Sequence, residues 1–293
     1  MKVGDYVSGL QQQFSDAGLC FAHGTDNSYD EACYLVFASL SLDWQEFEAE
    51  LDRQLTPAEI ALLDRRSRQR IRDRIPTAYL VGTAWFAGHE FKADSRALIP
   101  RSPIAELIEN RFTPLLRQSP QRVLDLCCGG GCIGIAIALE FPDASVDLAD
   151  LSVDALGLAK ENIDRFGLQD RVAPLQSDLF SGLPGQRYDL IVSNPPYVGA
   201  EELSGLPAEF RHEPRSGLES DDQGLQLPLR ILSAAADHLA ESGVLVMEVG
   251  YSHHLLAERY PDIPFLWLDF QRGGEGVFLL RRQQLEMYRE RFS

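Results

Sequence analysis

The sequence has no long apolar run and relatively few basic residues. No stretch approaches the roughly 18 consecutive apolar residues of a membrane-spanning helix, and the opening residues MKVGDYVSGLQQQF lack a signal peptide's apolar segment. The 293 residues include 27 lysines and arginines against 44 aspartates and glutamates, which gives a net charge of −17. Such a chain repels phosphate backbones, which disfavours a nucleic-acid substrate and favours a basic protein partner. We therefore expect a protein that acts away from membranes.

Cysteines are also few, and their arrangement excludes two common structural uses. The chain has five, an odd number, and three of them crowd between residues 127 and 132. That is a poor disulfide framework, so the sequence predicts a reducing, cytoplasmic location. Cys127, Cys128 and Cys132 have no histidine nearby and fit no zinc spacing. We expect small buried thiols and no metal site.

Three segments with different patterns divide the chain. Residues 1–75 show the apolar periodicity of helices, and Thr56-Pro57-Ala58-Glu59 predicts a helix start with a capping box. We expect this helical domain to recognise the substrate. Residues 76–100, with aromatics, glycines and short alternation, predict a β-hairpin linker, and residues 101–293 form the second domain.

The helix that follows Thr56 is rich in arginine. Six arginines lie between Asp64 and Arg74, in the stretch DRRSRQRIRDR. Charge runs of this kind usually form a solvated face paired with neighbouring acids. The alternative that the sequence leaves open is a docking patch, at Arg65–Arg74, for ribosomal RNA or for an acidic protein region.

From residue 104 onward, strand patterns alternate with helix patterns. We expect strands at RVLDLC, SVDLAD, RVAPLQ, YDLIVS, GVLVMEVG, FLWLDF and GVFLLRR, and helices at IAELIENRFTPLL, CIGIAIALEF, VDALGLAKENIDRFG and LPLRILSAAADHLAES. This alternation predicts a parallel, doubly wound sheet with helices on both faces. The last two strands lie close together and predict an antiparallel edge. The predicted fold class is therefore α/β, with a Rossmann-like, mostly parallel sheet and an antiparallel edge.

A glycine turn follows the first strand of this sheet. Gly129, Gly131 and Gly134 match the dinucleotide-binding pattern G-x-G-x-x-G, and Asp150 follows about 20 residues later. Asp125, just before the turn, separates two interpretations. A carboxylate there repels the pyrophosphate of NAD but attracts the ammonium and sulfonium groups of S-adenosylmethionine. We therefore predict S-adenosylmethionine as the cofactor.

Three acids would then lie at the carboxyl ends of three successive strands. We assign Asp150 to the ribose diol, and Asp178 with the apolar Leu179 beside it to the adenine. Each acid alone would also suit a helix cap or a turn. We assign Asp125 and the turn to the methionine end of the cofactor, where the turn residues are Cys127, Cys128, Gly129, Gly130 and Gly131.

The strand YDLIVS runs straight into Asn194-Pro195-Pro196-Tyr197. Prolines lack N–H groups, so the pair either stiffens a simple turn or presents only carbonyl acceptors. The side-chain carbonyl of Asn194 and the backbone carbonyl of Pro195 would form two fixed acceptors for a planar NH₂ group, with Tyr197 as a wall. Such a grip orients a poorly nucleophilic amide nitrogen toward a sulfonium methyl without a strong general base. We predict that these four residues are catalytic and that Asn194 also contacts the cofactor.

Together these motifs resemble the protein-(glutamine-N5) methyltransferases, which are class I S-adenosylmethionine-dependent enzymes that methylate a glutamine amide within a protein. The resemblance runs from about Pro76 to Gly250 and includes PTAYL, LIPRSP, VLDLCCGGGCIG, SDLF, NPPYV and RHEPRSGL. The runs PRSP and RHEP resemble the branch that methylates ribosomal protein number three of the large subunit. Seven acids against two arginines between Glu201 and Asp222 suit that basic substrate. The resemblance adds Arg101 and Glu213 as candidates for lining the substrate pocket.

Departures from the family pattern keep other functions open. Cys128 and Gly130 stand where relatives carry hydroxyl residues, and Gln223 stands where they tend to carry aspartate. NPPY also occurs in DNA enzymes that methylate amino groups. The alternatives are therefore glutamine methylation of peptide chain release factors, adenine amino-methylation of DNA or RNA, and a non-catalytic cofactor-binding assembly module. An NAD-linked oxidoreductase is a further alternative, but the NPPY loop would have no function in it.

Overall fold

A computed structural model describes residues 1–183 and 185–292, and its N-terminal part is helical. The helices are α1 (Val3–Asp16), α2 (Ser28–Leu40), α3 (Phe47–Asp52), α4 (Pro57–Asp73) and α5 (Thr77–Val81). They enclose an apolar cluster of their own, in which Phe14, Phe37 and Leu63 are fully buried. The expected capping box is present, because Thr56 and Glu59 at the start of α4 each accept a hydrogen bond from the other's backbone N–H.

A short hairpin connects this part to the rest of the chain. It consists of β1 (Thr83–Phe86) and β2 (His89–Lys92), which pair antiparallel. The predicted β pattern at PTAYLV is wrong, since those residues form α5. This helix begins after Pro76 and ends at Gly82, which adopts a left-handed φ of 83°. The hairpin is fixed to the second part by Asn162, whose side chain accepts a hydrogen bond of 2.8 Å from the Lys92 N–H.

The second part is built on one twisted sheet with the strand order β5-β4-β3-β6-β7-β9-β8. Strands β3 to β7 run parallel to one another, whereas β9 pairs antiparallel with both β7 and β8. The bounds are β3 (Arg122–Leu126), β4 (Ser145–Asp150), β5 (Val172–Gln176), β6 (Tyr188–Ser193), β7 (Leu239–Glu248), β8 (Leu266–Trp267) and β9 (Val277–Arg281). The predicted fold class, a mostly parallel α/β sheet with an antiparallel edge, is confirmed.

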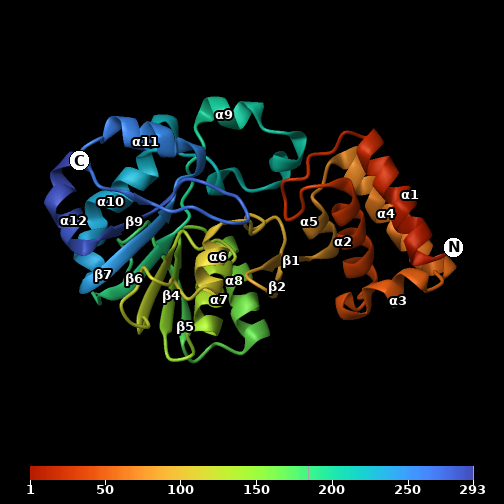
Figure 1. The fold of residues 1–293 in the computed structure, drawn as a ribbon, viewed down its shortest axis with the longest axis horizontal. Coiled ribbons are helices and arrows are strands. Elements are labelled where there is room, and N and C mark those ends of the chain that lie inside the picture. Colours follow the sequence, from red (N-terminus) through yellow and green to blue (C-terminus); the bar gives the residue numbers. More distant parts are fainter. Residues whose placement is uncertain (184, 293) are drawn as a thin grey trace.

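Helices cover both faces of this sheet (Figure 1). One face packs against α6 (Ile104–Glu109), α7 (Cys132–Glu140) and α8 (Val153–Phe166), and the other against α10 (Gln226–His238), α11 (His253–Arg259) and α12 (Arg282–Tyr288). Alternate residues of β3 divide between the two faces: Val123 belongs to the first apolar cluster and Leu124 to the second. Both side chains are fully buried, as expected for a central parallel strand.

Some predicted boundaries differ from the structure. The helix expected at IAELIENRFTPLL ends at Glu109, because Arg111 and Phe112 adopt left-handed φ angles of 53° and 52° that a helix cannot contain. Strand β7 begins at Leu239, inside the predicted helix, since Leu239 pairs with Tyr188 of β6. Helices α11 and α12 were not expected. Of the described helices, none combines the length and the apolar character needed to cross a bilayer.

A long segment between β6 and α10 returns to the N-terminal helices (Figure 1). We call residues 199–225 the return segment. It contains α9 (Ala200–Gly205) and short 3₁₀ turns at Ala208–His212, Arg215–Gly217 and Asp222–Gly224; the other 3₁₀ turns are Trp44–Glu46, Gly250–Ser252 and Arg289–Phe292. The imidazole Nε2 of His212 lies 2.8 Å from the Asp73 carbonyl oxygen at the end of α4. The return segment therefore joins the two parts of the molecule.

Candidate active site

A cavity of about 610 Å³ opens at the carboxyl ends of the parallel strands, between the sheet, the linker and the return segment. This is the edge at which open α/β sheets bind their ligands. Its wall includes these predicted site residues: Arg101, Cys127, Cys128, Gly129, Gly130, Asp150, Asp178, Leu179, Asn194, Pro195, Pro196 and Tyr197. Three predicted residues, Asp125, Gly131 and Glu213, do not line it. The glycine turn and the NPPY loop nevertheless share one cavity.

The glycine turn is shaped by close packing beneath it. A Cβ atom added to Gly134 would lie 2.3 Å from Leu148 and 2.9 Å from the Cβ of Asp125, so only glycine allows α7 to approach the sheet this closely. Above it, the Asp150 carboxylate accepts hydrogen bonds of 2.8 Å from the N–H groups of Gly129 and Ser152. Burial raises the pKa of Asp150 despite these bonds. The Asp150 side chain is thus fixed at the cavity wall.

Asp125 lies under the turn instead of on the cavity wall. Its Oδ2 accepts a 2.8 Å hydrogen bond from the Gly134 N–H, and its Oδ1 has no partner among the described residues although it is fully buried. Burial raises the pKa of this carboxyl to about 7, a rise that the Gly134 hydrogen bond opposes and the charge of Asp150 reinforces. Asp125, which was expected to hold the methionine end of the cofactor, therefore does not line the cavity. Asp125 instead supports the start of α7 and places an unpaired carboxylate oxygen beneath the turn.

We expect Asp125→Asn to stabilise the ligand-free protein at alkaline pH. Because the folded-state pKa is raised from 3.8 to about 7, the contribution of the neutral acid is complete below pH 3.8 and is lost as the pH rises through 7. Asparagine cannot ionise and still offers an oxygen to Gly134. The gain in free energy of unfolding is at most about 4 kcal/mol, the equivalent of this pKa shift. Urea unfolding at a series of pH values measures it.

The matched control for this prediction is the exposed Asp143, where Asp143→Asn should leave stability nearly unchanged. The gain for Asp125→Asn should grow between acid and neutral pH and then level off. A gain that is the same at every pH would contradict the assignment of the raised pKa to Asp125.

Asp178 and Leu179 lie at the far side of the turn. The Asp178 side chain is half-exposed, and its Oδ1 accepts a 3.0 Å hydrogen bond from Arg230. Leu179 is buried with a left-handed φ of 49°, and its carbonyl accepts a hydrogen bond from the Ser177 hydroxyl. This backbone conformation brings an apolar side chain and a carboxylate to the same stretch of wall.

The NPPY loop is held by hydrogen bonds on both sides. Ser193, the last residue of β6, donates its hydroxyl to the Leu126 carbonyl at 2.7 Å. The Tyr197 carbonyl accepts a 3.0 Å bond from the Ser252 hydroxyl, and Val198 pairs with the return segment. Asn194 is half-buried between these anchors and lines the cavity. The loop therefore presents Asn194 and Pro195 from a fixed backbone.

A buried acid that the sequence analysis missed orients Tyr197. Glu248, the last residue of β7, is 5% exposed and lines the cavity. Its Oε1 accepts a 2.8 Å hydrogen bond from the Tyr197 hydroxyl, and its Oε2 accepts one from the Ser102 hydroxyl. Burial raises the pKa of Glu248. A Cβ added to Gly250 would lie 2.5 Å from the Tyr197 ring, so the ring is enclosed from that side as well.

Arg101 and Glu213 form a bidentate ion pair behind the cavity wall. The two guanidinium nitrogens of Arg101 lie 2.6 and 2.8 Å from the two carboxylate oxygens of Glu213. His23 Nε2, from the N-terminal part, lies 3.4 Å from the same carboxylate. Burial would raise the pKa of Glu213, but His23 and Arg101 hold it at about 2. Arg101 lines the cavity over the Phe210 ring, whereas Glu213 anchors Arg101 and does not line the cavity.

One arginine of α4 lies inside the protein, whereas Arg65, Arg68 and Arg72 are exposed. Arg70 is 1% exposed, and its guanidinium donates to Glu31 at 2.7 Å, to Glu209 at 3.2 Å and to the Cys20 carbonyl at 2.8 Å. Arg74 also reaches Glu209, at 3.4 Å. The expected solvated face is therefore wrong for Arg70, and the alternative docking patch at Arg65–Arg74 cannot include it either, because Arg70 is not accessible to RNA. This network joins α4 to the return segment.

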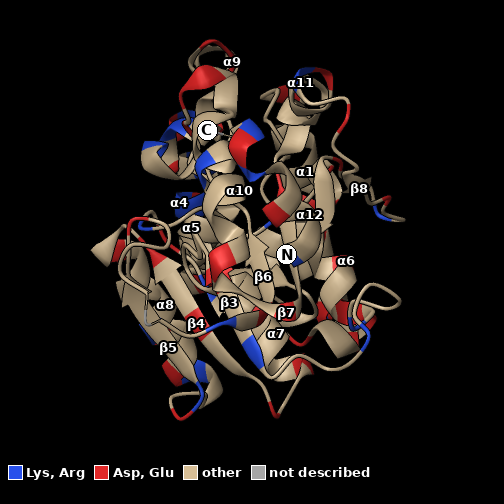
Figure 2. Cartoon of the chain, turned by 90° about the vertical axis from the view of Figure 1, so that its left-hand side faces the viewer, with Lys and Arg blue, Asp and Glu red and all other residues tan. Residues whose placement is uncertain are grey.

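The acidic return segment carries less free charge than its sequence indicates. Glu209 and Glu213 are buried in the ion pairs described above, while Glu219 pairs with Arg215 at 2.6 Å and Asp222 with Arg259 at 2.5 Å. Among the described residues, Glu201, Glu202 and Asp221 form no ion pair within 4 Å. Figure 2 shows the acidic turn of α9 at one end of the molecule. Only part of the expected acidic field is thus available to a partner.

Comparisons with known proteins identify the family. Residues 109–222 match the model described as methyltransferase small domain. The chain is 43% identical to a Francisella tularensis protein named ribosomal protein uL3 glutamine methyltransferase, over 99% of this chain and 93% of the relative. A Xanthomonas campestris protein of the same name is 46% identical, over 96% of this chain and 91% of the relative.

Solved structures add the fold. The hMettl16 catalytic domain in complex with MAT2A 3′UTR hairpin 6 is similar with a TM-score of 0.50 and 15% identity, covering 77% of this chain and 81% of that one. At that identity the likeness shows a shared methyltransferase fold and nothing of the substrate. The two full-length relatives are decisive: this chain belongs to the family of the ribosomal protein uL3 glutamine methyltransferases.

Proposed function

We propose that this enzyme transfers a methyl group from S-adenosylmethionine to the side-chain amide nitrogen of a glutamine in ribosomal protein uL3. The observation that carries the proposal is the single cavity whose wall contains both the glycine turn with Asp150 and the NPPY loop with Asn194. The names of the two full-length relatives supply the substrate. Because the cysteines are free thiols, the proposed location is the cytoplasm.

The residues around the glycine turn suit a cationic cofactor. Asp125 has a buried carboxylate oxygen without a partner, and Asp150 and Asp178 add two more carboxylates at the cavity. A pyrophosphate would face this negative field, which disfavours NAD. We assign the turn at 127–131, supported from below by Asp125, to the methionine end. Asp150 would hold the ribose, and Asp178 with Leu179 the adenine.

The cofactor would supply an electrophilic methyl group, whose bond to sulfur breaks as the new N–C bond forms, and the acceptor nitrogen would then lose its proton to water. The side-chain carbonyl of Asn194 and the backbone carbonyl of Pro195 would accept hydrogen bonds from the two N–H groups of the substrate amide. These bonds would direct the nitrogen lone pair toward the methyl group. Pro196 keeps the loop rigid, and Tyr197 walls the amide in. Neither proline has an N–H group, so the loop offers the substrate amide carbonyl acceptors and no backbone donor at Pro195 and Pro196. The rate acceleration would therefore come from positioning the substrate amide and not from a strong general base.

Arg101 would line the entrance for the substrate, with Glu213 holding its guanidinium in place. We assign substrate recognition to residues 1–75, the linker role to 76–100 and methyl transfer to 101–293. The shared interior of α4 and the return segment supports this division, because it brings the helical part next to the cavity wall. The exposed acids Glu201 and Glu202, of which Glu202 lines the cavity, would attract a basic protein.

We expect Tyr197→Phe to reduce turnover about tenfold and to lower the free energy of unfolding by about 1–3 kcal/mol. Phenylalanine keeps the ring but leaves Glu248 Oε1 buried without its donor. The ring would then lose the contact that fixes its orientation. Steady-state kinetics and urea unfolding measure the two effects. The exposed Tyr29 provides the control, since Tyr29→Phe should change neither quantity.

The function is tested with S-adenosylmethionine labelled in its methyl group. Purified uL3, a peptide chain release factor and DNA are offered separately, and the labelled residue is identified by peptide mass spectrometry. We expect label on one glutamine of uL3. Label in the release factor alone or in DNA alone would overturn the substrate assignment. Cofactor binding without methylation of any substrate would favour a non-catalytic assembly module.

A further inference from the structure

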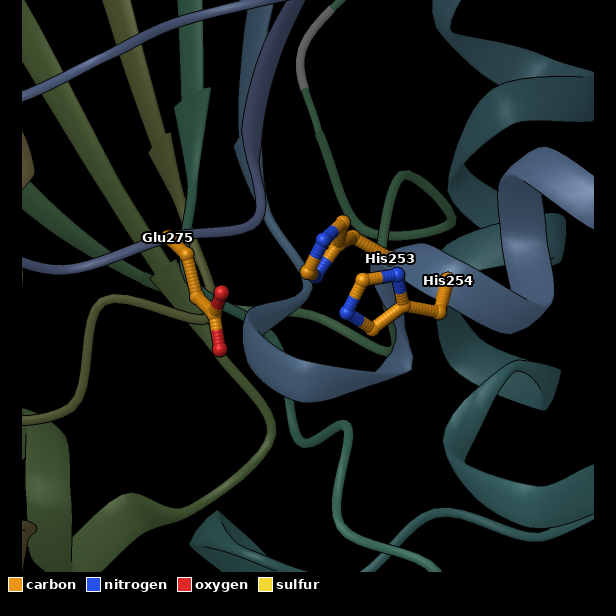
Figure 3. A group of neighbouring side chains, drawn as sticks. All are labelled: His253, His254 and Glu275. Carbon is orange, nitrogen blue, oxygen red and sulfur yellow. The ribbon is translucent and has the colours of Figure 1, made fainter.

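Three side chains of metal-binding type gather at the rim of the cavity, outside the residues assigned to methyl transfer. His253 and His254 begin α11, and Glu275 lies just before β9. One ligand atom from each of the three lies within 4.8 Å of the other two. Figure 3 shows the Glu275 carboxylate on one side of a common space and the two imidazole rings on the other.

The orientation of His253 favours metal binding. Its Nδ1 lies 2.9 Å from the carbonyl oxygen of Gly250. A carbonyl can only accept, so the proton of the neutral imidazole lies on Nδ1 and the lone pair on Nε2. In metal-binding histidines, the N–H of the ring nitrogen that does not bind the metal commonly donates a hydrogen bond to a backbone carbonyl in this way. The ring also packs edge-on against Trp267, with centroids 5.5 Å apart, which limits its rotation.

The other two side chains are accessible, although the His254 ring packs against the rings of His253 and Tyr251, with centroids 3.8 and 5.5 Å away. His254 and Glu275 are exposed, and neither forms an ion pair with another residue of the described chain. Two imidazoles and one carboxylate are a ligand set that zinc sites use, with a fourth position left for water. In such a site the ligand atoms lie about 2.0–2.2 Å from the ion. Exposed side chains can make the small inward movement that this requires.

We propose that His253, His254 and Glu275 bind a divalent transition-metal ion of the zinc class at the rim of the cavity. The ion would connect the start of α11, just after β7, to the segment just before β9. The backbone already links these segments there, because the Val249 N–H donates to the Gly276 carbonyl at 2.7 Å. Gly250 and Tyr251, which precede the two histidines, line the cavity. Metal binding would therefore stiffen the rim without contacting the methyl-transfer residues.

The test is equilibrium dialysis of the full chain, freed of any affinity tag, against Zn²⁺. We expect one tightly bound ion per chain, with affinity reduced at least about tenfold in His254→Ala and in Glu275→Gln. His89, on β2 at a distance from this group in sequence and fold, provides the control, and His89→Ala should bind as the wild type does. Zn²⁺ should also raise the unfolding temperature of the wild type and not that of Glu275→Gln.

Two outcomes would overturn the proposal. One is the lack of a stoichiometric ion in the wild-type protein. The other is unchanged zinc binding in the triple variant His253→Ala/His254→Ala/Glu275→Gln, which would place the ion elsewhere, for example on cysteine thiols. Circular dichroism of the variants shows whether they remain folded, and the exposed Glu275 makes Glu275→Gln the substitution least expected to disturb the fold.

Discussion

Asn194→Ala is expected to lower turnover about 100-fold or more while leaving the affinity for S-adenosylmethionine within about threefold of wild type. Its half-buried side chain lines the cavity on a loop that Ser193 and Ser252 anchor at both ends. Removing the side-chain carbonyl takes away one of two proposed acceptors for the substrate amide. The loss of turnover should arise in the methyl-transfer step, in which the amide nitrogen must be aligned with the methyl group. Methylation kinetics with uL3, together with calorimetry of cofactor binding, separate the two quantities.

Asn110→Ala provides the control for this variant. Asn110 is exposed at the end of α6, and its side-chain amide donates only to the Glu106 carbonyl of its own helix. It should leave both turnover and cofactor affinity unchanged. An Asn194→Ala enzyme with near-normal turnover would refute the proposed grip on the amide. A large loss of cofactor affinity with unchanged turnover would instead assign Asn194 to the cofactor alone.

Arg70→Met is expected to lower the free energy of unfolding by about 3–5 kcal/mol. The guanidinium is the shared partner of Glu31 and Glu209, and it is 1% exposed. Methionine fills a similar volume, but Glu31 and Glu209 remain buried without the positive charge that they share. Arg74 still reaches Glu209, at 3.4 Å, but among the described residues it forms no ion pair with Glu31. Urea unfolding followed by circular dichroism measures the loss.

The same helix offers a matched control. Arg72 is exposed and pairs only with the adjacent Asp73, so Arg72→Met should change stability by less than about 0.5 kcal/mol. Adding Glu31→Gln and Glu209→Gln to Arg70→Met removes the uncompensated charges and should recover much of the loss. Failure of this combination to recover stability would show that packing, not charge, accounts for the effect of Arg70→Met.

The sheet could be predicted from local patterns, because parallel strands buried on both faces are continuous apolar runs. SVDLAD and YDLIVS form β4 and β6 with the predicted limits. Where neighbouring φ angles turn left-handed, as at Arg111 and Phe112, the apolar pattern continues although the helix does not. Composition does not reveal such a stop. The short α5 was missed for a related reason, since its aromatic and β-branched residues are typical of strands.

The site was predictable where its residues lie at strand ends. The argument that selected Asp150 also applies to Glu248, an acid at the carboxyl end of the last parallel strand, and could have identified it. Asp125 was selected for its charge, but its depth below the turn depends on how closely Gly134 packs α7 against the sheet. The pairs Arg70–Glu209 and Arg101–Glu213 were beyond prediction because their members are 139 and 112 residues apart. Contacts across such distances leave no local periodicity.

The buried pair of Arg70 and Glu209 has a consequence for how this enzyme can acquire a new substrate. The two residues are 139 positions apart, and both ion-pair partners of Glu209, Arg70 and Arg74, belong to the N-terminal part. Recombination that replaced only the N-terminal helices by helices without these two arginines would therefore leave Glu209 as a buried charge without a partner, whereas in the removed helices Arg70 would keep Glu31. The helical part and the return segment must be inherited together. A chimera that transfers residues 1–75 with residues 199–225 should fold where a transfer of 1–75 alone does not.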